Sequence, residues 1–269
     1  MKIILGKKKL SKFTHNKKSI GFVPTMGGIH EGHISLIKRS INECKNTMVS
    51  IFVNKQQFNN RKDFVKYPRV LKRDIIKLKK LKIDILYLPK DKDIYPDGYN
   101  KKIKISSFKK KLCGRFRTRH FEGVADVIDR FIKIINPSKI YFGEKDLQQL
   151  KILEDFIKKN HPSCKVVPCK TIREKNGIAC SSRNILLNNI EKNIASKVFR
   201  LIKSNKKKLI QKKIKVYEIK NILYSMKVKK IDYIEILNIN KIIKPFKKIV
   251  KYKIFFAYYL NKTRLIDNI

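Results

Sequence analysis

Two histidines three residues apart, His30 and His33, are the side chains of this sequence best placed to do chemistry. They close the glycine-containing segment Pro24–His33. At helical spacing the two imidazoles would share one face of a first helical turn. The start of a helix offers free backbone N–H groups and the positive end of the helix dipole, which suit a chain of phosphates. The segment therefore predicts a site for a phosphorylated ligand.

The residues on either side of the histidines predict how they are held. A short apolar run, Ser19–Val23, is typical of a buried strand, and apolar residues then recur with helical period at positions 34, 37, 41 and 44. Gly27 and Gly28 lie between the two patterns and permit a tight turn. We therefore expect both histidines to lie where a strand turns into a helix.

Strand and helix patterns alternate up to about Pro168. The predicted strands are Ser19–Val23, Met48–Val53, Ile83–Leu88, Lys139–Phe142 and Lys165–Val167. The predicted helices are Gly32–Lys45, Tyr67–Leu81, Gly123–Ile135 and Leu147–Lys159. Such alternation implies a parallel sheet with helices on both faces and a ligand at the carboxyl ends of the strands. Asn54 and Gln57 follow the second strand and Gly143–Asp146 follows the fourth, so three polar clusters should meet at one edge.

The pattern changes after about Pro168. Helical, lysine-rich segments extend from Ile190 to about Met226, and short strand-like pieces follow at Asp232–Leu237 and Lys253–Leu260. This change in pattern predicts a smaller second domain.

The net charge of +45 comes from 66 Lys and Arg against 21 Asp and Glu. Taken alone, it favours a nucleic-acid partner. Lysine is spread over nearly every segment beside abundant Ile and Asn, however, which is typical of a genome-wide base bias toward A and T. A binding surface would instead concentrate charge on one face. We therefore favour a compositional origin, and we expect the densest run, Lys206–Lys215, to be a solvated helix face.

The cysteines and apolar runs indicate the compartment. Five cysteines without a Cys-x-x-Cys pair predict reduced thiols rather than a disulfide framework or a zinc site. The longest apolar run, Ile254–Leu260, is too short to cross a bilayer, and the start at Met1 lacks the apolar core of a signal peptide. These features predict a soluble cytoplasmic protein with no membrane partner.

Eight stretches, in their joint order and spacing, resemble the pantoate–β-alanine ligase (pantothenate synthetase) family along nearly the whole chain. They are Gly21–His33, Ser50–Phe58, Tyr67–Arg69, Tyr95–Pro96, His120–Ala125, Tyr141–Gln149, Thr171–Asn184 and Thr263–Asn268. This family is one of the His-x-Gly-His nucleotidyltransferases. The resemblance implies an α/β fold with a Rossmann-type parallel-sheet domain over residues 1–172, a smaller α+β lid domain over residues 173–269, and a homodimer.

The implied reaction has two steps. The carboxylate of pantoate attacks the α-phosphorus of ATP to give pantoyl adenylate and pyrophosphate, and the amine of β-alanine then displaces AMP. The product is pantothenate, on the route to coenzyme A. The implied small molecules are therefore ATP, pantoate and β-alanine, with Mg²⁺ as the metal.

The resemblance also implies roles for individual residues. His33 is the implied catalytic proton donor. The implied ATP site consists of Met26, Gly27, Gly28, Ile29, His30, Glu31, Gly32, His33, Gly143, Glu144, Lys145, Asp146, Ile172, Cys180, Ser181, Ser182 and Arg183. Gln57 and Gln149 match the residues that bind pantoate and β-alanine. Neutral amides suit hydroxyl and carboxylate oxygens without adding a charge that would compete for phosphate.

Asp74 is implied to hold Mg²⁺ through water, and an exposed helical ion-pair partner is the alternative for this residue. The arginines at positions 115, 117 and 119 are interpreted as a flap over the phosphates. The chain departs from the family pattern at Gly28, Lys55, Thr118, Arg119 and Cys180.

Two other functions stay open on the residues alone. One is a nucleic-acid-binding protein that retains a nucleotidyltransferase fold, which the net charge alone supports. The other is a different adenylate-forming or nucleotidyl-transfer enzyme. The pair Gln57 and Gln149 argues against the second, because it points to pantoate.

Overall fold

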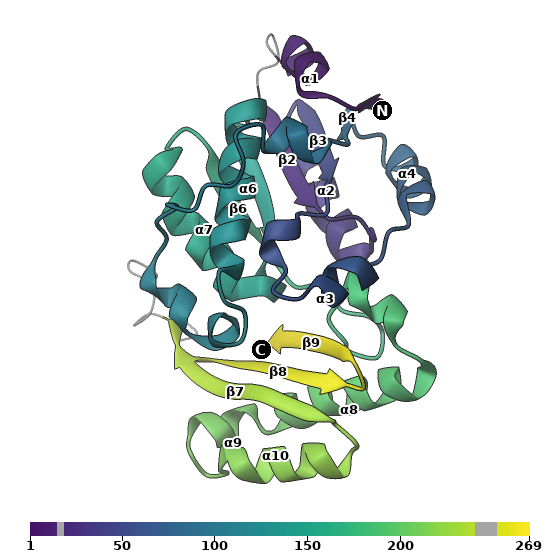
Figure 1. Ribbon diagram of the computed structural model, residues 1–269. Helices are drawn as coiled ribbons and strands as arrows, with labels where there is room; N and C mark the ends of the chain where they lie inside the picture. Colours follow the sequence, from purple (N-terminus) through teal and green to yellow (C-terminus); the bar gives the residue numbers. More distant parts are fainter. Residues whose placement is uncertain (15–18, 240–251) are drawn as a thin grey trace.

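The computed structural model describes residues 1–14, 19–239 and 252–269 and contains two β-sheets, one above the other in Figure 1. The larger sheet is parallel, with the strand order β1-β4-β3-β2-β5-β6. Its strands are β1 (Lys2–Ile4), β2 (Ile20–Thr25), β3 (Asn46–Ile51), β4 (Ile85–Tyr87), β5 (Lys139–Gly143) and β6 (Lys165–Cys169). The predicted parallel α/β sheet is therefore confirmed. Its strand order reverses between β2 and β5, the position where such sheets bind ligands.

The predicted strands lie within two residues of β2 to β6 at each end. Strand β1 was not predicted from the sequence. It is a three-residue strand at the edge of the sheet, and Ile4 is its one buried residue. So short a strand gives no usable hydrophobic pattern.

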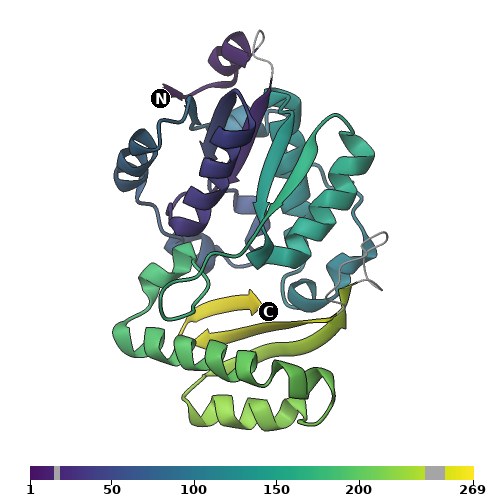
Figure 2. The same ribbon diagram turned by 180° about the vertical axis from the view of Figure 1, so that it is seen from behind.

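Side chains of β2 alternate between two apolar cores, as the pleat of a strand requires. Phe22 belongs to the core under α6, where its ring centroid lies 5.3 Å from that of Phe131. Val23 belongs to the opposite core, with Ile37 of α2 and Leu78 of α4. Figures 1 and 2 show α6 and α2 on opposite faces of the sheet. The helices of this part are α1 (Lys7–Thr14), α2 (Glu31–Glu43), α3 (Arg61–Lys66), α4 (Leu71–Lys80), α5 (Asp91–Ile94), α6 (His120–Ile135) and α7 (Leu147–Asn160).

Two of the predicted helices begin elsewhere. The segment predicted to be helical from Tyr67 becomes helical at Leu71, because Pro68 disfavours helical backbone at the residue before it. Tyr67 is accordingly extended, with φ −61° and ψ 131°. Helix α6 begins at His120, three residues before the predicted start, directly after Arg119 in a left-handed turn at φ 57°.

The smaller sheet is antiparallel, with the order β7-β8-β9. Its strands are β7 (Lys230–Asn238), β8 (Tyr252–Leu260) and β9 (Thr263–Asn268), and the helices of this part are α8 (Asn189–Ser204), α9 (Lys206–Ile210) and α10 (Val216–Ser225). The structure confirms helices in the lysine-rich region and strands at both predicted positions. Strand β9 was not predicted. Within the run Lys206–Lys215, Leu209 is buried and the lysines are half-buried or exposed, as a solvated face requires.

The smaller sheet lies against the carboxyl-terminal edge of the parallel sheet (Figure 1). The guanidinium of Arg173, in the segment after β6, pairs with both carboxylate oxygens of Asp267 in β9 at 2.6 and 3.0 Å. The division of domains at residue 172 stays a prediction. Within the described ranges, no helix combines the length and the apolar character needed to span a membrane.

Candidate active site

A buried carboxylate holds the glycine loop that follows β2. Gly27 and Gly28 adopt φ values of 83° and 64°, which glycine accepts at little cost. The N–H groups of Gly28 and Ile29 donate to the two carboxylate oxygens of Asp74, both at 2.8 Å. Asp74 is 1% exposed, so its interpretation as an exposed ion-pair partner is wrong. Its observed contacts support the loop backbone.

The imidazole rings of His30 and His33 stack, with their centroids 4.0 Å apart. His30 caps α2, since its Nδ1 accepts from the N–H of Gly32 at 3.1 Å. The Nδ1 atom of His33 is shielded from solvent and has no hydrogen-bond partner within the described residues. Desolvation lowers the pKa of His30 to about 2 and that of His33 to about 4. Both rings are therefore neutral at pH 7, and His33 has an unused nitrogen for a ligand.

The loop Gly143–Asp146 leads from β5 into α7 through a single 3₁₀ turn. The Lys145 ammonium lies 3.6 Å from the carboxylate of Asp146, and its charge helps to lower the pKa of both loop histidines. The amide Nδ2 of Asn268 donates to the carbonyls of Glu144 and Lys145, each at 2.9 Å. A residue of the smaller sheet thus holds the backbone of this loop.

Residues 180–183 lie opposite the glycine loop. The Ser182 hydroxyl donates to the carbonyl of Gly28 at 3.1 Å, and the Ser181 hydroxyl accepts from the N–H of Arg183 at 3.2 Å. The Arg183 guanidinium pairs with Asp63 of α3 at 3.2 Å. Cys180 is buried, and burial raises the pKa of its thiol. The Cys180 side chain therefore lines the cavity as a neutral thiol and does not offer a thiolate to a ligand.

Gln57 lies at the end of a short 3₁₀ helix, η1 (Lys55–Gln57), on which α6 packs directly. The Nδ2 of Asn54 donates to Oε1 of Gln57 at 3.3 Å, and Nε2 of Gln57 contacts the sulfur of Met26 at 3.1 Å. A Cβ atom on Gly123 of α6 would lie 2.6 Å from the carbonyl oxygen of Gln56. Glycine is therefore required where the two backbones meet.

Arg117 and His120 hold the backbone of Gln57, a role that the sequence did not predict. The Gln57 carbonyl can only accept, so Nδ1 of His120 donates to it at 2.7 Å. The Arg117 guanidinium can only donate, so Nε2 of His120 accepts from it at 3.0 Å. Burial keeps the pKa of His120 well below its usual value, which maintains this neutral tautomer. Arg117 also donates to the Gln57 carbonyl, at 3.1 Å, whereas Arg115 pairs with Glu235 of β7. The spacing Arg-x-x-His did not indicate this role, because the Gln57 carbonyl that both side chains bind lies 60 or more residues away in the sequence.

The two adjacent glutamines of α7 differ in their surroundings. Gln148 is 5% exposed, accepts from the N–H of Cys113 at 3.0 Å and donates to the carbonyls of Phe108 and Lys111 at 2.9 and 2.6 Å. Gln149 is half-buried and lines the cavity. Both glutamines line the cavity, but the Gln148 amide is bonded to backbone groups, so Gln149 is the better placed of the two to bind a ligand.

A cavity of about 1030 Å³ joins most of these groups. The implied site residues that line it are Met26, His30, Gly32, His33, Gln57, Gly143, Lys145, Asp146, Gln149, Ile172, Cys180, Ser181, Ser182 and Arg183. Those outside its lining are Gly27, Gly28, Ile29, Glu31, Asp74 and Glu144. The three loops predicted to meet at one edge of the sheet therefore do so, and both sheets contribute to the cavity wall.

The described residues contain no cluster of three or more His, Cys, Asp and Glu side chains placed to hold a metal ion. Both oxygens of Asp74 already accept backbone hydrogen bonds, and Asp146 lines the cavity. This donor set suits a hydrated Mg²⁺ carried by phosphate oxygens rather than an ion caged by protein ligands.

Comparison with known proteins decides the family. The family model described as pantoate-beta-alanine ligase matches residues 2–269. The chain belongs to the pantoate–β-alanine ligase family. A pantothenate synthetase from Sulfurihydrogenibium sp. is 40% identical over 258 residues, which covers 94% of this chain and 92% of that protein.

Solved structures of pantoate–β-alanine ligases share the fold. The ligase from Francisella tularensis, in complex with β-γ ATP and β-alanine, superposes with a TM-score of 0.87 at 35% identity and covers 100% of this chain and 97% of that one. The pantothenate synthetase from Thermus thermophilus gives a TM-score of 0.88 at 29% identity, covering 100% and 99%. The chain is thus an enzyme of this ligase family, with the Rossmann-type sheet and smaller second sheet that the resemblance implied.

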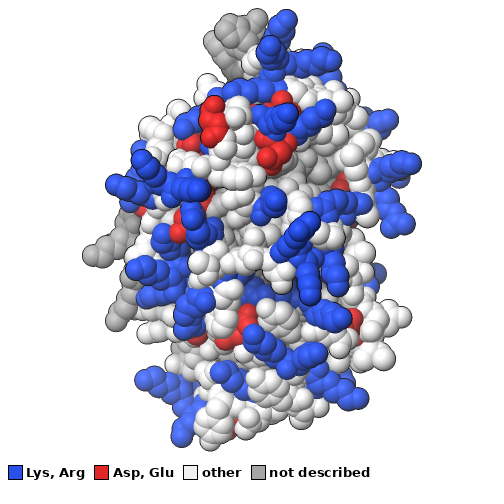
Figure 3. Space-filling view, in the orientation of Figure 1, with Lys and Arg blue, Asp and Glu red and all other residues white. Residues whose placement is uncertain are grey.

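The distribution of charge agrees with the compositional interpretation. Figure 3 shows Lys and Arg side chains scattered across the displayed face, over both sheets, rather than gathered in one patch. The family assignment favours the ligase function over the nucleic-acid-binding alternative.

Proposed function

We propose that the chain makes pantothenate from ATP, (R)-pantoate and β-alanine through a pantoyl adenylate, with release of AMP and pyrophosphate. One observation carries the proposal. A single cavity is lined by the stacked pair His30 and His33 and by the two amides Gln57 and Gln149. It thereby combines a phosphate-binding helix start with neutral hydrogen-bonding groups for a hydroxy acid.

In the adenylation step, negative charge develops on the α-phosphate and on the departing pyrophosphate. Fixed donors at those positions are each worth about 3–4 kcal/mol. We assign His33 to the α-phosphate as proton donor, with His30 beside it. A bound phosphate chain favours the charged imidazole, so it raises the His33 pKa from its low ligand-free value. We assign the further donors along the pyrophosphate to Lys145, Ser181 and Arg183, which all line the cavity.

We assign the pantoate oxygens to Gln57 and Gln149. Both lie on the cavity wall, Gln57 beside the glycine loop and Gln149 at the start of α7. The amine of β-alanine then attacks the adenylate carbonyl from the Gln57 side. Because neither amide carries charge, neither competes with the histidines for phosphate.

Mg²⁺, the domain roles and the assembly complete the proposal. We infer that Mg²⁺ would enter with ATP and would neutralise charge on its phosphates. Asp146 lines the cavity and could face that hydrated ion, whereas Asp74 is buried outside the lining and its oxygens hold the glycine loop. Residues 1–172 would bind ATP and pantoate, and residues 173–269 would act as the lid. A homodimer in the cytoplasm that serves coenzyme A synthesis is the assembly and setting that the family resemblance supports.

The decisive experiment measures AMP release with ATP, Mg²⁺, pantoate and β-alanine, omitting one substrate at a time. We expect AMP to form when all are present and to fall to background without pantoate or without β-alanine. Omission of Mg²⁺, with a chelator present, tests the metal separately. A folded protein that binds ATP yet releases no AMP with the complete mixture would contradict the proposal.

A further inference from the structure

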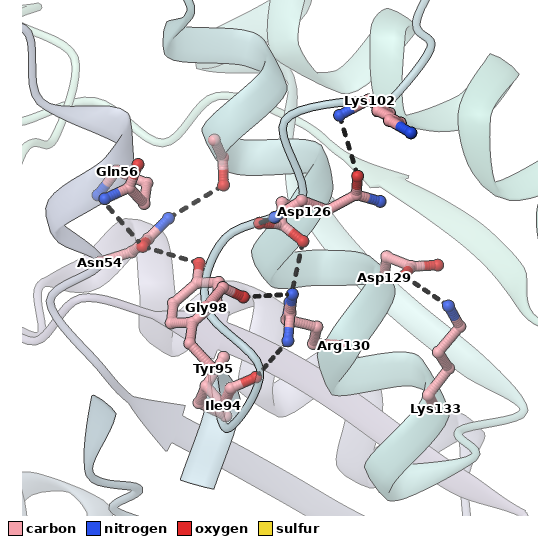
Figure 4. Close-up of polar contacts among 12 residues, drawn as sticks. Asn54, Gln56, Ile94, Tyr95, Gly98, Lys102, Asp126, Asp129, Arg130 and Lys133 are labelled. Atoms are coloured by element: carbon pink, nitrogen blue, oxygen red, sulfur yellow. Dashed lines mark hydrogen bonds and ion pairs between the residues drawn. The ribbon is translucent and has the colours of Figure 1, made fainter. Parts of the chain in front are cut away.

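The orientation of the Asn54 amide is fixed by one group that can only donate and one that can only accept. The N–H of Gln56 faces Oδ1 of Asn54 at 3.3 Å, and the carbonyl of Gly123 faces Nδ2 at 2.9 Å (Figure 4). Nδ2 is therefore the atom that meets Gln57, and it donates to Oε1. The amide of Gln57 takes its orientation from Asn54.

Tyr95 makes the shortest hydrogen bond to the Asn54 oxygen. Its hydroxyl donates to Oδ1 at 2.9 Å, and the tyrosine is 5% exposed. Burial, with the nearby Asp126 carboxylate, raises the Tyr95 pKa, so the hydroxyl keeps its proton across the working pH range. This hydroxyl is thus a permanent donor aimed at one atom of Asn54.

Arg130 of α6 clamps the segment that carries Tyr95. Its guanidinium carbon lies 4.7 Å from the centroid of the Tyr95 ring. The same group donates to the carbonyls of Ile94 and Gly98 at 2.9 and 2.7 Å, and to Asp126 at 2.9 Å (Figure 4). The two hydrogen bonds to the carbonyls of Ile94 and Gly98 and the cation–π interaction therefore fix the ring against α6, while the contact with Asp126 orients Arg130 within the helix.

We propose that Tyr95 is a positioning residue for the substrate amide: by holding Asn54, it makes Gln57 present its Nε2–H donor, not its carbonyl, to the cavity. In this structure Nε2 contacts the Met26 thioether, which is a weak acceptor. A carboxylate or hydroxyl oxygen of the substrate would replace that contact with a stronger one. The proposal rests on the assignment of Gln57 to pantoate made above.

The variant Tyr95→Phe removes the hydroxyl and leaves the ring against Arg130. We expect the KM for pantoate to rise about tenfold, with kcat and the KM for ATP changed by less than about twofold, since one buried hydrogen bond to a neutral group is lost. Tyr99→Phe is the matched control, because Tyr99 packs on Tyr95 with ring centroids 4.6 Å apart while its hydroxyl contacts Asp91. The control should leave the KM for pantoate unchanged.

A double-mutant cycle tests whether Tyr95 acts through Gln57. In a Gln57→Ala background, Tyr95→Phe should add no more than about twofold to the KM for pantoate. Equal effects of Tyr95→Phe in both backgrounds, or no effect in the native one, would overturn the proposal. If Gln57→Ala itself leaves the KM for pantoate unchanged, the assignment of Gln57 fails, and this proposal fails with it.

The direction of the hydrogen bond is tested without altering Tyr95. Gln57→Glu keeps an acceptor for Asn54 and replaces the Nε2 donor with a carboxylate oxygen. We expect it to raise the KM for pantoate at least as much as Gln57→Ala does. Pantoate affinity retained in Gln57→Glu would mean that the carbonyl faces the substrate, which contradicts the proposed direction.

Discussion

His30 and His33 have different roles although their rings stack. His30 uses Nδ1 to cap α2, so its ring is part of the helix start. His33 keeps Nδ1 shielded and without a hydrogen-bond partner among the described residues. An unpaired buried nitrogen is costly unless a ligand satisfies it. At the scale of single residues, His33 is therefore the group prepared for the reacting phosphate.

Replacing His33 with alanine should lower kcat by about 10²–10⁴-fold, the usual contribution of a positioned proton-transfer group. The AMP-release assay at saturating ATP and pantoate measures it. His161→Ala is the matched control, because His161 pairs with Asp129 and lies outside the cavity lining. Near-normal kcat in His33→Ala would remove the catalytic assignment.

Stability should fall as pH drops below about 6.5 and should continue to fall to about pH 4, the folded-state pKa of His33. The His30 and His33 pKa values are lowered from 6.5 to about 2 and about 4, so the unfolded state binds more protons in that window. This stability is fully present above pH 6.5 and is lost on acidification. His30→Asn retains an oxygen that can cap α2, but asparagine does not titrate. The midpoint of thermal unfolding of this variant should therefore fall less steeply with decreasing pH than that of the native protein. If the midpoint of thermal unfolding depends on pH as steeply in His30→Asn as in the native protein, His30 does not contribute to this loss of stability.

At the scale of elements, the substrate loop depends on how closely α6 lies against η1. Gly123 permits that approach, and Arg117 and His120 hold the Gln57 carbonyl from the same helix start. Strand β2 and helix α2 supply the phosphate-binding side in a comparable way, through a turn between them. Each half of the site is thus a short segment fixed by a neighbouring long helix or strand.

Gly123→Ala should destabilise the fold by about 1–3 kcal/mol, as overpacking does in a tight contact. It should also raise the KM for pantoate, because η1 must move away from α6. Gly6→Ala is the control, since its added Cβ would meet nothing closer than 4.0 Å. Chemical denaturation and steady-state kinetics together measure both effects. An unchanged KM in a destabilised Gly123→Ala protein would separate packing from substrate binding.

The local parts of this architecture could be predicted from the sequence. The turn from β2 to α2 has a short-range signal in an apolar run, two glycines and a helical period. The role of Asp74 had no such signal, because the loop it supports lies 46 residues away in the chain. The Arg117–His120 pair was equally hidden, since its partner, the Gln57 carbonyl, is 60 or more residues distant. Tertiary contacts of this kind require the folded chain.

At the scale of the whole molecule, the two sheets are joined beside the cavity. Asp267 and Asn268 of β9 bind Arg173 and the carbonyls of the Gly143–Asp146 loop. The smaller sheet therefore acts on the proposed nucleotide loop through its backbone. Any movement of this sheet would move that loop with it.

Asn268→Ala should raise the KM for ATP about five- to twentyfold, because two hydrogen bonds to the loop carbonyls are lost. Its effect on the KM for pantoate should be smaller, since Gln57 is held from α6. Asn205→Ala is the matched control, because that amide bonds to Leu201 and Ser204 within its own helix end. An equal rise in the KM for ATP and the KM for pantoate would indicate a general destabilisation of the site rather than a specific role of Asn268 at the loop Gly143–Asp146.

The contact between β9 and the nucleotide loop also orders events during synthesis of the chain. All strands of the parallel sheet are synthesised before those of the smaller sheet, because they precede Lys170 in the sequence. The amide that holds the Glu144 carbonyl arrives 124 residues after that glutamate. A nascent chain can therefore pair the strands of the parallel sheet while the core under α6 still lacks Tyr233, Phe255 and Ala257 and the loop edge is unfinished. The loop Gly143–Asp146 therefore gains its last backbone support only when β9 has been made.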